Sequence, residues 1–325
     1  MYTLIGGELS LFTRKLEAAL IFYGADFEFV SKRAVDAAMV ETRAGTHQVP
    51  VLQTPENWML SDTTPMIAML DSRFPGRAMF PEGEQGALVH ILEEHLDEWI
   101  ARVMVHYRWH YADSTAFASM KIAEGDPDAA AQIANWGPRA CRATGTDSEQ
   151  QQQAAEDEYV RILEAAEAQL QRTAFLLGDR PTAVDCMVLG GLRAHTYMDP
   201  DPKKVVANFP TVVDWTERRA DQWAGDGGRE GDGELAPLSD ITPFAQHVLS
   251  EIADTYVPFV LANRDAQEAG AKAFHADIYG EKVSYLTRPY PETSRQMVAK
   301  RIASLDTREQ IDKLLKEYGL SQVFC

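Results

Sequence analysis

The sequence is short of cysteine, of basic residues and of long apolar runs, and each shortage excludes a class of protein. Its three cysteines (Cys141, Cys186 and Cys325) lie far apart without paired spacing, which indicates neither a disulfide framework nor a zinc site. Lys and Arg number 31 against 49 Asp and Glu, so the formal net charge is -18. Nucleic acids and anionic membrane surfaces carry the same sign, and we expect neither as a partner.

No apolar run approaches the length of a membrane-spanning helix, and the N-terminus has no charged leader followed by a long apolar core. We therefore expect a cytoplasmic protein. The composition, 45% hydrophobic and 25% charged, is typical of a globular chain. A length of 325 residues predicts about two domains.

The first eighty residues predict alternating strands and helices. Apolar runs and helical spacing give, in order, a strand, a helix, a strand, a helix, two strands and a helix, over residues 2–5, 12–23, 27–30, 35–42, 49–52, 58–60 and 64–70. This order favours an α/β domain at residues 1–80.

The stretch from 45 to 70 carries the main motif. Proline cannot donate to a sheet ladder, so Pro50 at the start of a buried strand needs a reason, and a cis Val49–Pro50 bond would supply one. Farther on, Thr63 or Thr64 is predicted to cap a helix with Pro65 in its first turn.

These residues resemble the glutathione site of the glutathione transferases, in which Val49-Pro50 is followed about a dozen residues later by Asp62-Thr63. The resemblance implies a thioredoxin-like first domain followed by an all-helical second domain. It also implies that the backbone of Val49 pairs with the cysteinyl part of glutathione, and that Asp62 and Thr63 hold the γ-glutamyl end. The residue types suit this role, because an ammonium needs a carboxylate and a carboxylate is bound well at a helix N-terminus.

Ser10, in the segment Ser10 to Lys15, lies where the family places its catalytic serine or cysteine, although Leu11 replaces a common proline. The resemblance implies that its hydroxyl donates to the glutathione sulfur and keeps it ionised. Lowering a thiol pKa by about two units takes about 2.7 kcal/mol, and one hydrogen bond to a charged acceptor contributes about 1.5–3 kcal/mol. One alternative is that Ser10 is simply the N-cap of the first helix; we expect the two roles to exclude each other, because a capping hydroxyl oxygen faces the backbone. The other is that Tyr2 contacts the sulfur instead.

Two neighbours of this motif have weaker signals. Gln48 falls where the family often has a lysine or glutamine near the glycine carboxylate of glutathione, and His47 could share that duty. Both are equally well interpreted as solvated loop residues. Thr13 stands where redox members of the fold keep a second cysteine, so disulfide exchange through a protein thiol is disfavoured.

Longer helical periodicities follow a linker near residues 74–83. One extended helix is predicted from Leu88 to His110. Its aromatic end, residues 106–111, either forms the acceptor pocket or packs in the helical core. His106 and His110 have the spacing of a metal pair but no third ligand, so we expect no metal. Residues 124–153 are polar and irregular, which predicts a loop-rich insertion or a surface element without chemistry, and a helix is expected at 156–171.

The most specific string runs from Leu177 to Cys186. Thr182 and Asp185 have the spacing of a capping box, and the string resembles the motif that nucleates the second domain of glutathione transferases. We place that all-helical domain at 84–223. The resemblance ends there.

The remainder predicts a mobile linker at 224–240 and a C-terminal extension at 241–325 that packs on the helical domain. Expected in the extension are a helix at 243–263 kinked near Pro258, a strand at 283–287, and helices at 292–304 and 306–318.

Taken together, these features predict a glutathione-dependent enzyme that attacks a small hydrophobic electrophile. Conjugation is the leading outcome, with ether cleavage or reductive removal of a group as alternatives. Glutathione would be the cosubstrate, and the family's habit suggests a homodimer. The competing interpretation is a non-catalytic glutathione transferase-like module that serves binding or interaction.

Overall fold

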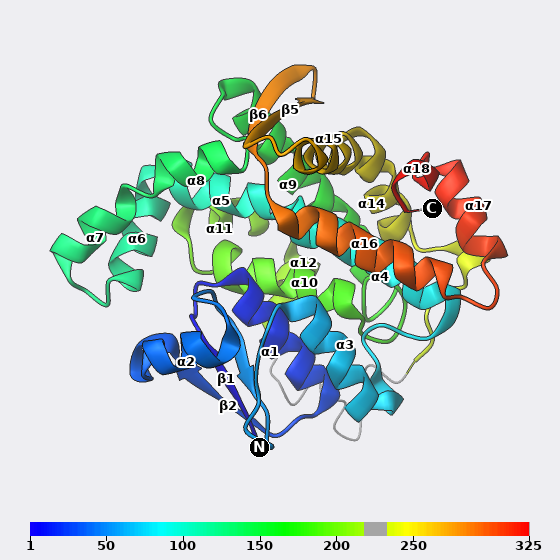
Figure 1. Ribbon diagram of the computed structural model, residues 1–325, viewed down its shortest axis with the longest axis horizontal. Helices are drawn as coiled ribbons and strands as arrows, with labels where there is room; N and C mark the ends of the chain where they lie inside the picture. Colours follow the sequence, from blue (N-terminus) through cyan, green and yellow to red (C-terminus); the bar gives the residue numbers. More distant parts are fainter. Residues whose placement is uncertain (218–232, 325) are drawn as a thin grey trace.

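The structure is a computed structural model that describes residues 1–217 and 233–324. A small α/β domain lies at the bottom of Figure 1, and helices make up most of the rest (Figure 1). The α/β domain contains, in order, β1 (Tyr2–Gly6), α1 (Leu11–Tyr23), β2 (Phe27–Ser31), α2 (Ala37–Ala44), β3 (Val51–Gln53), β4 (Met59–Ser61) and α3 (Thr63–Arg73). The order of strands and helices predicted for this part is confirmed.

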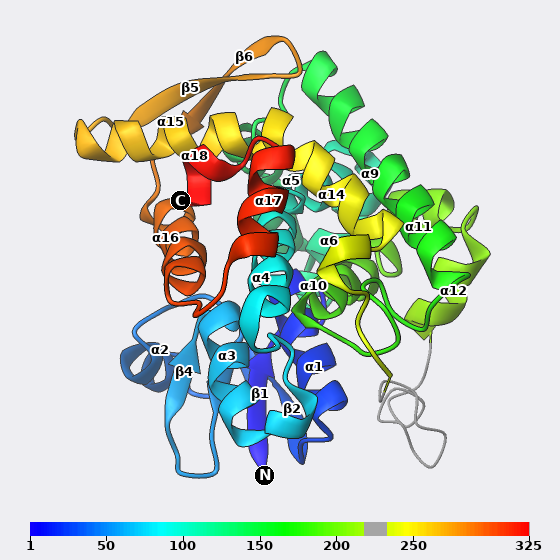
Figure 2. The ribbon, with the colours of Figure 1, turned by 90° about the vertical axis from the view of Figure 1, so that its right-hand side faces the viewer.

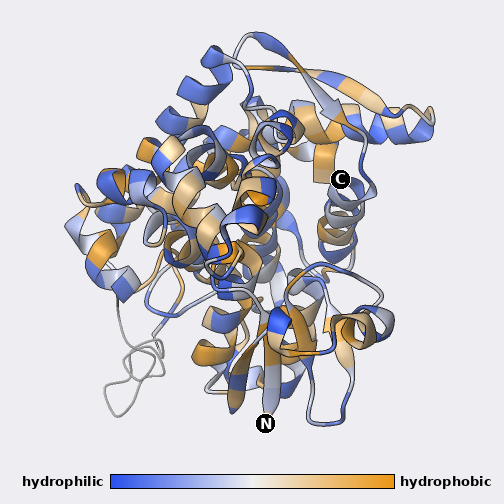
Figure 3. Ribbon diagram, turned by 90° about the vertical axis from the view of Figure 1, so that its left-hand side faces the viewer, coloured by the Kyte–Doolittle hydropathy of each residue, from blue (hydrophilic) through white to orange (hydrophobic). Residues whose placement is uncertain are grey.

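The four strands form one sheet in the order β2-β1-β3-β4. Strand β2 pairs parallel with β1, β3 pairs antiparallel with β1, and β4 pairs antiparallel with β3. Successive strand residues face opposite sides. Leu4 and Leu52 therefore join the main core beside α1 and α3, whereas Ile5 and Val51 pack with Val40 of α2 on the other face. This is the thioredoxin-like arrangement. Figure 3 shows stretches of the hydrophobic colour in these strands beside paler ones, and both faces of the sheet contribute buried side chains.

Local signals explain the ends of several elements. Gly24 ends α1 in the left-handed conformation, with φ of 65°, and its N–H returns to the helix. At α3 the prediction was wrong in detail, because the N-cap residue is Asp62 and neither threonine caps the helix. Asp62 itself has φ of 74°, a region that non-glycine residues rarely adopt.

The helical part is built from α4 (Gly83–Glu98), α5 (Ala101–His110), α6 (Ala112–Ile122), α7 (Pro127–Ala134), α8 (Gly137–Ala143), α9 (Glu149–Leu170), α10 (Ala183–Gly191), α11 (Pro200–Val206) and α12 (Pro210–Glu217). The two parts meet where α1 packs on α10. A Cβ added to Gly190 would lie 2.7 Å from the carbonyl oxygen of Leu11, so glycine permits this close approach.

Two predictions about the helical part were wrong. The single helix expected to reach His110 is broken at Trp99–Ile100, where the N–H groups of both residues turn back to the carbonyl of His95. The polar stretch at 124–153 was expected to be a loop-rich insertion or a surface element, but it is not rich in loops, because it contains α7, α8 and the start of α9. Asp126 and Ser148 cap α7 and α9 with their side chains, so the polar residues in this stretch include helix start signals.

The C-terminal extension contains α14 (Pro243–Asp254), α15 (Tyr256–Glu268), β5 (Ala273–Ile278), β6 (Glu281–Leu286), α16 (Pro289–Ala303), α17 (Glu309–Glu317) and α18 (Ser321–Phe324). The predicted strand at 283–287 exists, but its antiparallel partner β5 was missed. The predicted helix at 243–263 is two helices divided at Thr255 rather than one kinked at Pro258. Figure 2 shows α16 and α17 beside α4.

Helix α4 lies at the centre of these contacts. Every residue from Gly86 to Leu96 is buried, because α10, α14, α16 and α17 all pack on this helix. Two of its carboxylates accept hydrogen bonds from the extension: the Tyr256 hydroxyl donates to Glu94 (2.6 Å), and the Gln310 N–H donates to Glu84 (2.8 Å).

The expected linker at 224–240 is described only in part, because residues 218–232 lie outside the described ranges. The part that is described does not behave as a free linker. Asp179 N–H donates to Glu234 O and Ala236 N–H donates to Leu177 O, each at 2.9 Å. This segment is therefore bound to the loop that precedes α10.

Candidate functional site

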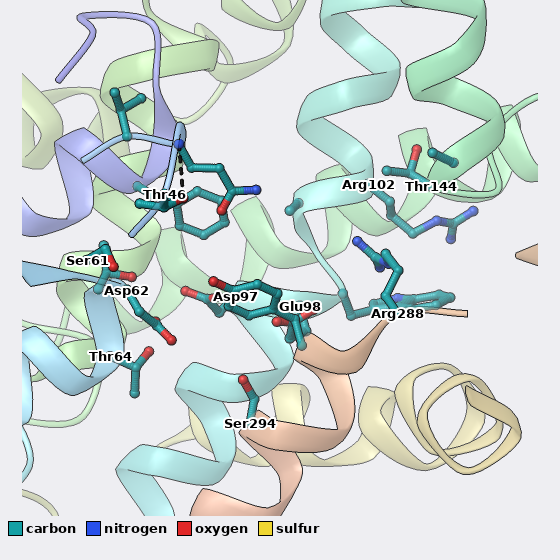
Figure 4. A pocket seen from close by; sticks show the side chains of 18 of the residues that line it. Thr46, Ser61, Asp62, Thr64, Asp97, Glu98, Arg102, Thr144, Arg288 and Ser294 are labelled. Atoms are coloured by element: carbon teal, nitrogen blue, oxygen red, sulfur yellow. Dashed lines mark hydrogen bonds between the residues drawn. The ribbon is translucent and has the colours of Figure 1, made fainter. Parts of the chain in front are cut away.

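The bond between Val49 and Pro50 is cis, as the sequence predicted. It lies just before β3, beside the loop in which Thr46 Oγ1 accepts from Gln48 N–H (3.1 Å). Next to it is a cavity of about 310 Å³ that we call the Pro50 pocket (Figure 4). Five of the six residues selected from the sequence line it, namely Gln48, Val49, Pro50, Asp62 and Thr63.

One wall of the Pro50 pocket is the N-terminus of α3. Thr63 and Thr64 are the first residues of this helix, so their backbone N–H groups lie at its positive end. Partial burial, together with the nearby charge of Asp97, raises the pKa of Asp62. The start of α3 thus joins anion-binding N–H groups with a carboxylate that suits a cation.

A buried ion network supports this wall. Lys15 of α1 is fully buried, and its ammonium contacts the carboxylates of Glu93 and Asp97 on α4 as well as the Thr64 hydroxyl at 3.2 Å. Burial lowers the pKa of Lys15, but Asp97 and Glu93 outweigh that effect and hold it above its ordinary value. The network fixes α1, α3 and α4 to one another directly beneath the pocket.

The end of α4 adds two carboxylates that sequence reasoning missed. Burial raises the pKa of Asp97 to about 6 despite Lys15, and burial together with Asp97 raises the pKa of Glu98 to about 7. Both side chains line the Pro50 pocket, between Asp62 on one side and Arg102 and Arg288 on the other (Figure 4). No local motif marks them, since they become neighbours of Asp62 only through helix packing.

Ser10 lies in an adjoining hollow of about 1490 Å³, which we call the Ser10 pocket. Val49 lines both pockets, so it lies between Ser10 and the other four selected residues, which line the Pro50 pocket alone. Ser10 is the N-cap of α1, and its Oγ accepts from Thr13 N–H at 3.2 Å. A serine hydroxyl has one donor and two acceptor sites, so this cap leaves the O–H free to donate elsewhere.

The loop that carries Ser10 is tied to the helical part by a residue that sequence reasoning missed. Arg108 of α5 is buried and donates to the carbonyl of Leu9 (2.7 Å) and to that of Ala194 (2.9 Å). Its charge is paired with buried Asp199 at 2.7 Å. Arg108 stands in the aromatic segment 106–111, and no spacing rule distinguishes it there.

Several weaker candidates lie elsewhere. The Tyr2 hydroxyl accepts from Arg73 (3.0 Å), and Tyr2 lines neither pocket. His47 is exposed, and its carbonyl accepts from Lys32. No residue of the aromatic segment 106–111 lines either pocket; His106 and Tyr107 are buried in the helical part instead.

Within residues 1–217 and 233–324, no three His, Cys, Asp or Glu side chains are grouped so that they could hold a metal ion. No helix in the same ranges has both the length and the apolar character that crossing a bilayer requires.

Solved structures with a similar course of the chain have low sequence identity. A glutathione S-transferase from Rhodospirillum rubrum F11 is 17% identical, covering 68% of this chain and 90% of its own, with a TM-score of 0.48. The beta-etherase LigF from Sphingobium sp. strain SYK-6 is 15% identical, covering 70% and 99%, with a TM-score of 0.48. Glutathione transferase F7 from Populus trichocarpa is 17% identical, covering 70% and 99%, with a TM-score of 0.43. No curated protein matches this chain.

Two family models match the sequence directly. The N-terminal domain of glutathione S-transferases matches residues 4–78, and the C-terminal domain matches residues 115–222. Together these segments make up more than half of the chain, and neither reaches α14 or any later element. The chain belongs to the glutathione S-transferase family and continues beyond it in a C-terminal extension.

Proposed function

We propose that this protein is a glutathione transferase that ionises the glutathione thiol for attack on a hydrophobic electrophile. The observation that carries the proposal is the gathering of Gln48, Val49, Pro50, Asp62 and Thr63 around one pocket, with Ser10 next to it across Val49. We further propose that residues 1–80 bind glutathione, that 84–223 form the helical domain, and that 241–325 act as an extension packed on it.

In the proposed complex, glutathione lies extended in the Pro50 pocket. The backbone of Val49 pairs with the cysteinyl unit, because main-chain pairing gives affinity without particular side chains. Asp62 takes the γ-glutamyl ammonium, and the N–H groups at the start of α3 take its carboxylate. Gln48, which also lines the pocket, takes the glycine carboxylate.

Ser10 is proposed to donate its hydroxyl proton to the glutathione sulfur. A hydrogen bond to a charged acceptor contributes about 1.5–3 kcal/mol, which is close to the roughly 2.7 kcal/mol needed to lower a thiol pKa by about two units. The N-terminus of α1 adds about 0.3–1 kcal/mol for a negative charge placed there. Together these contributions are sufficient.

The electrophile is proposed to enter the Ser10 pocket. Its wall contains the apolar side chains of Leu9, Phe29, Val35, Phe117 and Met120, which come from both parts of the molecule. Small-molecule sites are mostly apolar and have polar groups that fix the orientation of the ligand. The charged residues that also line this pocket are Glu8, Lys32, Arg33, Lys121 and Glu124. The apolar residues favour an aromatic or aliphatic acceptor.

The test is the ultraviolet absorbance of the glutathione thiolate when glutathione is bound to wild type and to Ser10→Ala. The pKa of the bound thiol should lie well below that of free glutathione in wild type and should rise in Ser10→Ala. The conjugation rate should fall by about 10–100-fold, the equivalent of one hydrogen bond to a charged group. Ser72→Ala is the matched control, because Ser72 is exposed on α3 and lines neither pocket.

A panel of electrophiles, scored for adducts and for oxidised glutathione, identifies the reaction. If wild type binds glutathione but neither lowers the pKa of its thiol nor forms product with any electrophile, the protein is a binding module and the proposed activity is wrong. If the thiol is ionised but Ser10→Ala leaves its pKa unchanged, Ser10 does not have the role proposed for it.

A further inference from the structure

One end of the Pro50 pocket is built by the C-terminal extension together with the junction of α4 and α5. Figure 4 shows Arg102 and Arg288 there, across the pocket from Asp62 and Thr64. We call this the Arg288 end, and the residues that form it all line the pocket. They are Trp99, Arg102, Phe259, Tyr285 and Arg288. Neither family match includes any of them, so a role for them does not follow from membership of the family.

The aromatic rings of the Arg288 end form one continuous wall between the two arginines. The Arg102 guanidinium lies 4.8 Å from the centre of the Trp99 ring, and that ring is 5.6 Å from the ring of Phe259. The rings of Phe259 and Tyr285 are 5.0 Å apart, and the Arg288 guanidinium lies 6.0 Å from the centre of the Phe259 ring. A flat apolar group in the pocket would therefore meet aromatic surface next to positive charge.

Two buried donors at the Arg288 end have no hydrogen-bond partner in the part of the chain that the structure describes. They are Nε of Arg102 and the hydroxyl of Tyr285, which belong to residues that are only 2% and 3% exposed. The rest of the Arg102 guanidinium is bonded, to Glu158 at 3.1 Å and to Gln151 at 2.8 Å. Buried donors are nearly always paired in native proteins, because an unpaired one costs free energy. Both donors need an oxygen acceptor, which a ligand in the pocket would supply.

Arg288 adds a positive charge that the fold does not use. Buried Asn263 of α15 donates to the Arg288 carbonyl (2.8 Å) and accepts from its N–H (2.9 Å), so the backbone is held in place. The guanidinium forms no ion pair with a carboxylate of residues 1–217 or 233–324, and faces Phe259 instead. Arg288 is exposed, so a dissolved ligand can reach its charge.

The acidic residues nearby limit the charge that a ligand can carry. Asp97 and Glu98 line the same pocket, and Asp97 contacts the ammonium of Lys15. Burial, together with Asp97, raises the pKa of Glu98 to about 7, so Glu98 carries only part of its charge near neutral pH. One available cation beside these carboxyl groups favours a monoanion, such as a carboxylate, over the dianion of a phosphate ester.

We propose that the Arg288 end binds an aromatic carboxylic acid, whose carboxylate lies between Arg288 and the unpartnered donors of Arg102 and Tyr285. The aromatic ring of the acid would lie against Trp99 and Phe259. Hydrogen bonds from a guanidinium to a carboxylate are charge-assisted and stronger than neutral ones. None of these residues is among those assigned to glutathione, so the inference goes beyond the proposed function and does not rest on it.

The test uses 3-phenylpropionate as the probe and 3-phenylpropanamide as its uncharged counterpart, with dissociation constants measured by calorimetry. Wild type should bind the acid about 10–100-fold more tightly than the amide, as expected for hydrogen bonds to a charged group. Arg288→Met should remove most of this preference by weakening the acid alone. Arg288→Lys should keep part of it, because lysine retains the charge but not the planar pair of donors. Arg264→Met is the matched control, because Arg264 pairs with Asp265 at 2.8 Å and does not line the pocket.

A second variant, Tyr285→Phe, tests the buried hydroxyl. It should weaken binding of the acid about 2–10-fold, the effect of losing one hydrogen bond. It should not lower the free energy of unfolding, because the hydroxyl has no partner within the described residues. Loss of stability without any change in the affinity for the acid would contradict the proposal, since the hydroxyl would then serve the fold.

The outcomes also separate this site from the proposed glutathione site. Equal affinity for the acid and the amide would overturn the proposal, and so would an affinity for the acid that Arg288→Met leaves unchanged. If wild type binds glutathione but not 3-phenylpropionate, this inference is wrong and the proposed function stands. If wild type binds 3-phenylpropionate with the expected preference but does not bind glutathione, the proposed function is wrong and this site stands.

Discussion

Among single residues, Asp97 and Glu98 have the clearest consequence for pH dependence. Burial raises the pKa of Asp97 to about 6, and burial with Asp97 raises that of Glu98 to about 7. Lys15 and Glu93 contact or face Asp97 beneath the pocket, while Arg288 and Asp62 face Glu98. Near these pH values the two carboxyl groups therefore change charge, whereas the ammonium of a peptide ligand does not.

We predict that glutathione binds more tightly as the pH rises through these values, because a protonated carboxyl attracts an ammonium less than a carboxylate does. The dissociation constant should fall by up to about tenfold per pH unit while one such carboxyl group titrates. Calorimetric titration of wild type and Glu98→Gln across this range measures the effect, and the variant should show a shallower dependence. A flat profile in wild type would contradict the prediction.

Arg108 gives a second prediction at this scale, because one side chain fixes the Ser10 loop and neutralises a buried acid. Arg108→Met leaves Asp199 unpaired, and breaking a buried pair costs about 3–5 kcal/mol in the free energy of unfolding. The double variant Arg108→Met, Asp199→Asn removes the stranded charge and should recover part of that loss, as measured by denaturant unfolding.

The double variant also separates folding from positioning. It still lacks the donor to the Leu9 carbonyl. The pKa of the thiol of bound glutathione should therefore stay above its wild-type value even where stability returns. Recovery of both stability and thiol pKa would show that Arg108 serves the fold alone.

For the individual elements, the start of α10 is the clearest case. Asp185 is fully buried and accepts from Thr182 N–H (2.8 Å), from the Thr182 hydroxyl (2.9 Å) and from Leu176 N–H (2.9 Å). Asp185 and Thr182 form the predicted capping box. Burial raises the pKa of Asp185 to about 6, although these hydrogen bonds favour its ionised form.

Asp185→Ala should lower the free energy of unfolding by about 2–4 kcal/mol, because it leaves buried donors without a partner. Asp126→Ala is the control: Asp126 caps α7 with similar bonds at the surface, and its loss should cost only about 0.5–2 kcal/mol. Urea unfolding measures the free energy of unfolding of both variants, and the slope of that free energy against urea concentration should equal that of wild type. Equal costs would mean that burial adds nothing to the cap of α10.

Some helices and strands could be predicted from the sequence and others could not. The order of the first domain, the cis bond at Pro50 and the cap at Asp185 follow local rules, and each is present in the structure. The break of the helix at Trp99 could not be predicted, because no glycine or proline lies near it in the sequence. Strand β5 was missed although Phe274, Ala276 and Ile278 alternate with exposed residues, because the run is short and begins with alanine.

The candidate site divides in the same way. Gln48, Val49, Pro50, Asp62 and Thr63 form a motif within a short stretch, and so their common pocket could be predicted. Residues brought to the site by packing could not be predicted, since no spacing relates them to this motif. They are Asp97, Glu98, Arg108 and Arg288.

At the scale of the whole molecule, the largest hydrophobic cluster of the described residues includes side chains from the α/β domain, the helical part and the C-terminal extension. A single cluster of buried side chains includes Leu4 of β1, Leu92 of α4, Trp215 of α12 and Phe324 near the C-terminus. We predict that the protein unfolds in one calorimetric transition whose van't Hoff and calorimetric enthalpies agree. A separate early transition, removed by deleting the extension, would contradict this.

The burial of α4 on all sides has one more consequence. Helix α4 is buried by segments that lie far from it in the sequence. Three of them, α14, α16 and α17, belong to the C-terminal extension. A protein trimmed to the boundaries of the two family matches would expose to water the side of α4, including its apolar side chains, that α14, α16 and α17 cover, and should aggregate during expression. We therefore expect the C-terminal extension to be required for a stable fold, so a protein without it should not yield an isolated, folded pair of family domains.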